Sequence, residues 1–135
     1  MDILVRAGIA LLLLFGGISL NLLYQRWVRF RFSKLLPDLG PLRSGAFALV
    51  YFTTPACVPC KTVQRPAIQE VSQILGDALQ VFEIDATQQP GIASRWGVLS
   101  VPTTFIIDPR GKMRHANYGV ARAEKLLMQI QHAQD

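Results

Sequence analysis

Two cysteines separated by two residues are the part of this sequence best suited to chemistry. Cys57 and Cys60 are the only cysteines in the 135 residues, and they lie where an apolar run meets a helical pattern. With this spacing, two sulfurs can come within bonding distance across one helical turn. The first thiolate can attack a disulfide of another molecule, and the second can then resolve the mixed disulfide. The spacing therefore predicts a dithiol/disulfide site with Cys57 as nucleophile and Cys60 as resolving cysteine.

The flanking residues predict a strand before the pair and a helix after it. Residues 47–52 form a short apolar run between Gly45 and Thr53, which suits a strand buried on both faces of a sheet. Apolar residues then recur at helical spacing: Val63, Ala67, Ile68, Val71, Ile74 and Leu75. The N-terminus of this helix would lower the pKa of the Cys57 thiol below the free value of about 8.5. Pro59 would stiffen the first turn, and we expect it to lie where substrate binds.

Two other uses of the cysteine pair compete with redox chemistry. A zinc site takes four ligands, and only His115 and His132 remain, both far along the chain. A structural disulfide that closes a loop of two residues would stabilise little, because the stabilisation grows with loop length. A redox role is therefore the favoured interpretation. It requires no bound cofactor and no metal, since the cysteine pair carries the electrons.

The charge is unevenly distributed along the chain. The formal net charge is +5; residues 1–45 hold six basic residues against two acidic ones, and the remaining ninety hold eight against seven. The basic character thus belongs to the N-terminal segment. No basic face with interleaved aromatic residues is evident in the sequence, so a nucleic-acid partner is not expected.

The N-terminal segment has the length and composition of a membrane anchor. Residues 3–24 contain one charged residue, Arg6. As a helix they would span about 33 Å, enough for a hydrocarbon core of about 30 Å. A cleavable signal sequence is the alternative, but no small-x-small cleavage site follows the apolar stretch. A buried core helix would need a polar face. We expect residues 1–34 to form a lipid-bound anchor with a basic flank, 35–45 a linker and 46–135 a globular domain.

The charges that flank the span predict its orientation. Four basic residues follow it, Arg26, Arg29, Arg31 and Lys34, whereas Arg6 and the terminal amine precede it. The positive-inside rule then places the C-terminal domain in the cytoplasm. Binding of this cluster to anionic headgroups is the alternative explanation. Residues 27–32 alternate apolar and basic side chains, which fits either a short strand or the end of the anchor helix.

The rest of the chain alternates strand and helix patterns. We expect strands at 79–85, 103–108 and 113–118, a short helix at 91–96 and a turn at 109–112. A last helix presents an apolar face formed by Ala123, Leu126, Leu127 and Ile130. The predicted order is β-α-β-α-β-β-α, which indicates an α/β domain.

This order, together with two motifs, resembles the thioredoxin family over about residues 46–133. The motifs are the strand followed by Cys57-Val58-Pro59-Cys60-Lys61, and Trp96-Gly97-Val98 leading into Val101-Pro102-Thr103. The resemblance implies a thioredoxin-like fold with a central mixed sheet. We expect the transmembrane helix indicated by residues 3–24 to precede this fold. It also implies that Pro102 is cis and lies against the disulfide, and that the backbone of Val101 pairs with substrate. An ordinary trans proline at the start of a strand is the alternative. Trp96 is expected in the core or at a substrate-contacting rim.

The sequence also departs from the family pattern. Ala56 replaces the usual Trp, Val58-Pro59 replaces Gly-Pro, and Pro66 lies six residues after Cys60 where five is commoner. Loss of the Trp removes part of the surface that thioredoxin offers to partners. A broad, thioredoxin-like substrate range is therefore not assured by the resemblance.

A further departure concerns the proton of the second cysteine. The family's buried acid aligns with Tyr51, and the lysine facing it aligns with Glu83. A phenol is a poor base at neutral pH. Glu83 would serve as the proton acceptor if burial raised its pKa. Alternatively, Tyr51 is a core residue and Glu83 is an exposed strand residue.

Together these features predict a membrane-tethered thiol-disulfide oxidoreductase that reduces protein disulfides. Its partners would be protein disulfide substrates, an upstream thiol reductant and the lipid bilayer. One alternative enzyme is an extracytoplasmic oxidase, isomerase or cytochrome-maturation reductant, which needs the opposite orientation. The alternative without catalysis is a thioredoxin-like docking module whose cysteines are incidental.

Overall fold

The computed structural model divides the chain into two compact units, residues 1–34 and 35–135. It describes residues 3–33 and 36–134, with the side chains of 28–37 left out of the description.

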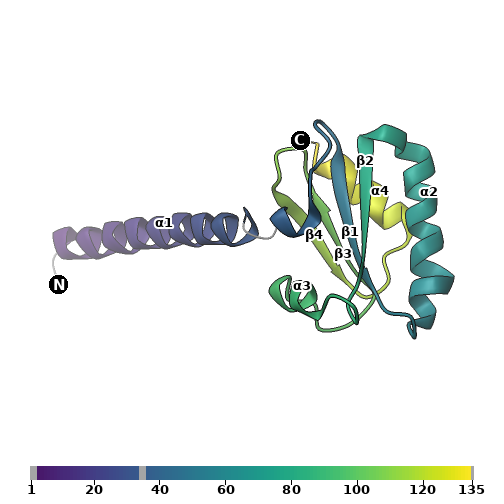
Figure 1. Ribbon diagram of the computed structural model, residues 1–135. Helices are drawn as coiled ribbons and strands as arrows, with labels where there is room; N and C mark the ends of the chain where they lie inside the picture. Colours follow the sequence, from purple (N-terminus) through teal and green to yellow (C-terminus); the bar gives the residue numbers. More distant parts are fainter. Residues whose placement is uncertain (1–2, 34–35, 135) are drawn as a thin grey trace. The chain divides into compact units, whose positions relative to one another are not determined.

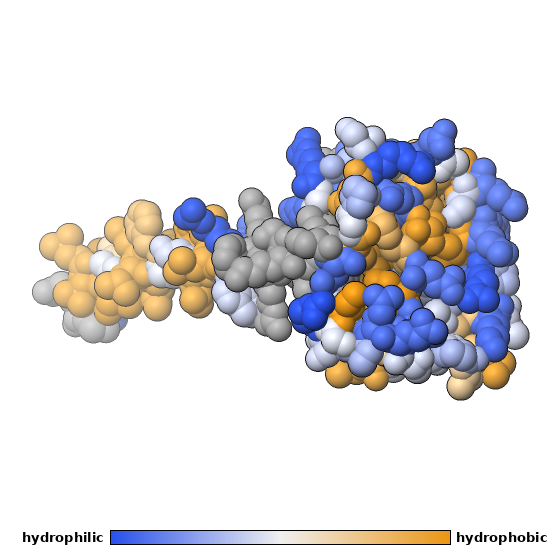
Figure 2. Space-filling model, viewed as in Figure 1, coloured by the Kyte–Doolittle hydropathy of each residue, from blue (hydrophilic) through white to orange (hydrophobic). Residues whose placement is uncertain are grey.

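The first unit is a single helix, α1, Ile3–Ser33. Its segment Ile3–Trp27 has a mean hydropathy of 2.2 and buries none of its side chains. Figure 2 shows apolar side chains along much of this segment. By length and composition it is therefore a candidate membrane span. The backbone stays helical to Ser33, so the strand alternative for residues 27–32 is wrong.

The second unit contains a mixed sheet of four strands (Figure 1). The strands are β1 (Phe47–Thr53), β2 (Leu79–Asp85), β3 (Thr103–Ile107) and β4 (Met113–Tyr118), in the spatial order β2-β1-β3-β4. β1 runs parallel to β2 and antiparallel to β3, and β3 pairs with β4 as a hairpin. The predicted mixed sheet is thus confirmed, and the active-site segment follows a central strand.

Helices cover both faces of this sheet. α2 (Arg65–Leu75) and α4 (Ala123–His132) pack on one face, where Leu49 and Tyr51 of β1 share a buried cluster with them. α3 (Pro90–Arg95) lies apart from these two helices in Figure 1, and Trp96 directly after it packs on Phe52. Successive strand residues point to opposite faces, so both faces of β1 are occupied. Every residue of β1 is buried, as the apolar run predicted.

Residues 38–43, within the segment predicted as a linker, are hydrogen-bonded to the domain. Arg95 Nη2 lies 2.7 Å from Asp38 Oδ1, and the Arg43 amide donates to Gln80 Oε1 at 2.7 Å. Gln80 Nε2 in turn donates to the Pro41 carbonyl at 3.3 Å. The proline and glycine content of this stretch indicates turns, but it does not tell whether those turns pack on a neighbouring surface.

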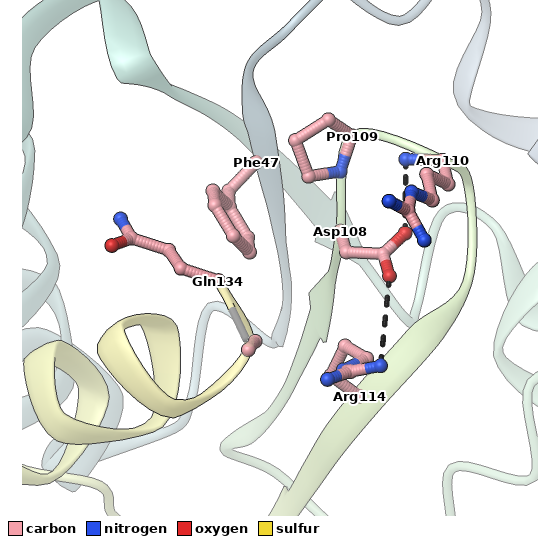
Figure 3. A pocket seen from close by; sticks show the side chains of 7 residues that line it. Phe47, Asp108, Pro109, Arg110, Arg114 and Gln134 are labelled. Atoms are coloured by element: carbon pink, nitrogen blue, oxygen red, sulfur yellow. Dashed lines mark hydrogen bonds and ion pairs between the residues drawn. The ribbon is translucent and has the colours of Figure 1, made fainter.

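A buried aspartate organises the hairpin between β3 and β4 (Figure 3). Asp108 Oδ1 accepts hydrogen bonds from the amides of Arg110 and Lys112, and its Oδ2 lies 3.9 Å from Arg114 Nη1. Asp108 also lines a pocket of about 270 Å³ with Phe47. Phe47 begins β1 and Asp108 follows β3, so this pocket lies at the end of the sheet opposite to the cysteines.

Candidate active site

Cys57 and Cys60 lie between the end of β1 and the helix that follows it, and they form a disulfide with an S–S distance of 2.05 Å. Cys57 keeps 8% of its surface exposed, whereas Cys60 is fully buried. Of the two cysteines, Cys57 is therefore the more accessible to another molecule. This arrangement is the one required of a nucleophile and its resolving partner, and these two roles stay predictions.

The backbone at the helix start points a hydrogen-bond donor at Cys57. Helical residues begin at Val58, so Cys57 occupies the position that caps the helix. The Cys60 amide, in the first helical turn, donates to Cys57 Sγ at 3.2 Å. Cap side chains normally accept from an amide at this position, and helix N-termini favour negative charge. Once the disulfide is reduced, the same donor would stabilise a thiolate at Cys57.

The loop before β3 carries the second part of the site. The Val101–Pro102 peptide bond is cis, as predicted. Val101 packs against the buried cluster that contains both cysteines. The carbonyl of Pro102 accepts a hydrogen bond from the Gly119 amide at 2.9 Å. The roles of Val101 and Pro102 toward substrate stay predictions.

A comparison with known proteins matches the Thioredoxin family model to residues 41–132. The chain belongs to the thioredoxin family. It is 41% identical over 85 residues to a chloroplastic thioredoxin Y of rice, Oryza sativa subsp. japonica, covering 63% of this chain and 49% of that protein. It is 32% identical over 83 residues to a thioredoxin-like protein of Synechocystis sp., covering 62% of this chain and 77% of that protein.

The chain spans about half of the rice relative and 61% of a thioredoxin from Bacillus subtilis to which it is 34% identical. Among solved structures, thioredoxin-2 of the malaria parasite superimposes with a TM-score of 0.64 at 17% identity, covering 69% of this chain and 88% of that one. The thioredoxin-like fold predicted from the sequence is thereby confirmed.

The thioredoxin active-site helix contains an irregular turn in this chain. Residues Cys60–Gln64 form a π-helical turn, in which the Arg65 amide donates to the Cys60 carbonyl five residues earlier. A π-helical turn accommodates one extra residue within an α-helix. It therefore accounts for Pro66, which lies six residues after Cys60 where five is commoner in the family.

Tyr51 is a core residue that supports this turn. It is 1% exposed, and its hydroxyl donates to the Cys60 carbonyl at 3.2 Å. Burial raises the pKa of the phenol, an effect that the Glu83 charge reinforces and a hydrogen bond with Thr53 opposes. Tyr51 is therefore a neutral donor at physiological pH and does not replace the family's buried acid as a base.

Glu83 does not have the surroundings that its predicted role requires. Its Cα is the register partner of Tyr51, but its side chain is 47% exposed and lies 2.6 Å from Arg65 Nη2. The hypothesis of a proton acceptor rested on burial of Glu83, and the exposure of this side chain contradicts that premise. β2 is one of the two edge strands of the sheet, and Val81 and Glu83 along it are open to solvent.

Sequence reasoning did not identify Gln64, which joins the active-site helix to the segment before α4. Gln64 is fully buried; its Oε1 accepts from the Ala121 amide at 2.8 Å and its Nε2 donates to the Ala121 carbonyl at 3.0 Å. Gly119, two residues before Ala121, donates its amide to the Pro102 carbonyl. These contacts therefore link the active-site helix to the loop that carries the cis proline. Gln64 shares a helix face with Ala67, Ile68 and Val71, and that spacing was the available signal.

The remaining predicted site residues separate into exposed and buried ones. Pro59 is exposed beside the disulfide, where a substrate can contact it. Trp96 is 4% exposed and packs on Phe52 and Phe105, with ring centroids 5.8 and 5.1 Å apart. The expectation of a core position for Trp96 is thus confirmed. Its contact with substrate stays a prediction. No group of three or more metal-binding side chains occurs within residues 3–33 and 36–134.

Proposed function

We propose that the domain is a thiol-disulfide oxidoreductase that reduces disulfides of other proteins. The observation that carries this proposal is the Cys57–Cys60 disulfide at the start of a helix, with the Cys60 amide directed at Cys57 Sγ. The cis peptide before Pro102 and the membership of the thioredoxin family support the same activity.

In the proposed reaction, the Cys57 thiolate attacks one sulfur of the target disulfide. The target S–S bond breaks, a Cys57–target mixed disulfide forms, and the other target sulfur leaves as a thiolate. Cys60 then loses its proton and attacks Cys57 Sγ, which forms the Cys57–Cys60 disulfide and releases the second target sulfur. Two electrons pass to the target, and two protons complete its thiols. An upstream thiol reductant must return the domain to the dithiol form.

We also propose that helix α1 tethers the domain to a membrane, with its lipid bilayer as a further partner. The apolar segment Ile3–Trp27 supports this tether, since it has the length of a span. The basic residues that follow the span favour a cytoplasmic domain. A cytoplasmic location in turn favours the reducing direction, because thiols are kept reduced there. A tether would confine the enzyme to substrates near the membrane and raise their effective concentration.

The activity is tested with the purified full-length chain, dithiothreitol and a model protein disulfide. We expect reduction faster than with dithiothreitol alone. Cys57→Ser is expected to lower the catalysed rate to the background, because it removes the attacking sulfur while the fold can be checked by circular dichroism. Unchanged turnover in a folded Cys57→Ser variant would favour the docking-module alternative.

The direction of electron flow is tested by the reduction potential, read from an equilibrium with glutathione. A reductant is expected near the thioredoxin value of about −270 mV, whereas a potential near −120 mV is typical of a strong oxidant. The second outcome would favour the extracytoplasmic oxidase and contradict the reducing direction proposed here.

A further inference from the structure

An open groove lies between the active-site helix and α4. Its volume is about 600 Å³. Three apolar side chains line it, Val63, Val120 and Met128, together with three charged ones, Arg122, Glu124 and Lys125. This combination of an apolar lining and charged side chains is typical of a surface that binds a peptide segment.

Both walls of the groove are connected to the dithiol. Val63 belongs to the π-helical turn that begins at Cys60, and it lies roughly 9 Å along the helix axis from Cys57 at 1.5 Å per residue. On the other side, Val120 precedes Ala121, which Gln64 holds through two hydrogen bonds. A chain whose cysteine reaches Cys57 can therefore place its neighbouring residues in this groove.

Two of the three apolar side chains that line the groove are open to solvent. Val120 is 41% exposed and Met128 is 52% exposed, and Val58 beside Cys57 is 67% exposed. Methionine adapts its shape to different apolar partners, which suits a surface that must accept more than one target. Exposed apolar groups that gather beside a reactive site indicate contact with a partner.

The charged side chains around the groove are mostly basic and are not neutralised by neighbours. Arg122 and Lys125 line the groove, and Lys61 lies on the adjoining helical turn. Four other arginines of the domain form ion pairs with carboxylates: Arg43, Arg65, Arg95 and Arg114. Lys61, Arg122 and Lys125 have no ion-pair partner within residues 36–134, and Glu124 is the only acidic side chain that lines the groove.

We propose that this groove binds the segment next to the target's disulfide and selects targets that carry an apolar side chain followed by acidic residues. The inference rests on the proposed reduction of protein disulfides. The apolar lining would take the apolar side chain, and Arg122 and Lys125 would attract the acidic residues. Complementary charges at the edge of a contact act mainly on association and on its salt dependence. An anionic lipid surface would use the same cations but would leave the concave apolar lining without a partner.

The test compares two peptides, each closed by one disulfide and identical except in the residues that flank the cysteines. One carries a leucine and two glutamates on both sides, and the other carries a serine and two lysines. The full-length chain in neutral detergent should give a higher kcat/KM with the acidic peptide, by roughly five- to tenfold. The preference should shrink in high salt, because exposed charges are screened.

Two variants and a matched control assign the preference to the groove. Arg122→Glu combined with Lys125→Glu should remove or reverse the preference through KM, with kcat at saturation unchanged. Met128→Gln should lower kcat/KM for the leucine-containing peptide alone. Lys112→Glu, in the β3–β4 turn at the opposite end of the sheet, should leave the preference as in the wild type.

Each contrary outcome has a distinct meaning. If the wild type reduces neither peptide, the proposed function itself is overturned. Reduction of both peptides with equal kcat/KM, or an equal loss with both peptides in the double variant, would overturn the groove proposal alone. A double variant that loses binding to vesicles of anionic lipid but keeps the wild-type preference would assign the cations to a membrane surface and would also overturn it.

Discussion

At the scale of single residues, the two cysteines differ in both exposure and hydrogen bonding. Cys57 retains 8% exposure and accepts a hydrogen bond from the Cys60 amide, while Cys60 is buried beneath it. The Cys60 carbonyl in turn accepts from Tyr51 and from the Arg65 amide. Tyr51, which aligns with the family's buried acid, thus donates a hydrogen bond to the backbone of the active site.

A substitution of Tyr51 tests this interpretation. Tyr51→Phe removes the hydroxyl bond to the Cys60 carbonyl and should lower the free energy of unfolding by about 1 kcal/mol. Urea denaturation of the oxidised protein measures this difference. Tyr118→Phe is the matched control, because Tyr118 is 67% exposed and its loss should change stability little. Equal stability of Tyr51→Phe and wild type would contradict the role assigned to the hydroxyl.

The stabilisation that Tyr51 contributes should depend on pH. Burial raises the pKa of Tyr51 in the folded state above its unfolded value of about 10, so its contribution is complete below pH 10. That contribution is lost as the pH rises through the folded-state value. The difference in unfolding free energy between wild type and Tyr51→Phe should therefore narrow above pH 10. A difference that widens there would contradict the direction of the shift.

At the scale of elements, the active-site helix is positioned by a wide turn and a buried glutamine. The π-helical turn Cys60–Gln64 takes up one residue, and Gln64 then bonds to both backbone groups of Ala121. Periodicity predicts that a helix is present, but it does not reveal a change from four-residue to five-residue hydrogen bonding. In the same way, the alternation of apolar and polar residues predicted β2 correctly. It did not predict the exposure of Glu83, which depends on how far α2 covers that edge strand.

Gln64→Leu tests the connection between the helix and the segment before α4. The substitution leaves the buried amide and carbonyl of Ala121 without their partner, which should cost about 2–4 kcal/mol of unfolding free energy. Gln69→Leu, at an exposed position of α2, is the matched control and should change stability by less than about 0.5 kcal/mol. Equal effects of the two substitutions would show that the Gln64 contacts contribute nothing specific.

At the scale of the whole molecule, the sequence is sufficient to predict the order of elements, the cis bond before Pro102 and the mixed sheet. These features depend on local patterns and on motifs that the thioredoxin family shares. The packing of residues 38–43 onto the domain was not predicted, because the Asp38–Arg95 pair joins residues far apart in the sequence. The core was one of two positions expected for Trp96, and the sequence could not choose between them because the packing of this ring depends on Phe52 and Phe105, which come from two different strands.

The proposed tether makes a prediction about topology. In a chain with Cys57→Ser, Cys60→Ser and Asp135→Cys, the single remaining thiol reports the side on which the domain lies. We expect an impermeant maleimide to label this thiol only after intact cells are opened, because the basic flank of α1 favours a cytoplasmic domain. Labelling in intact cells would contradict that orientation and would support the extracytoplasmic alternative.

The most direct measurement of the central claim is to trap the mixed disulfide. A reduced Cys60→Ser variant retains Cys57, which keeps 8% of its surface exposed, but lacks the fully buried sulfur that would release a target. Mixed with a model protein disulfide and free of other thiols, it should accumulate a covalent adduct at Cys57, visible by mass spectrometry and cleaved by dithiothreitol. The reduced Cys57→Ser variant should form little or none. Absence of the Cys57 adduct, or equal adduct formation by both variants, would contradict the assignment of Cys57 as nucleophile and of the buried Cys60 as resolving cysteine.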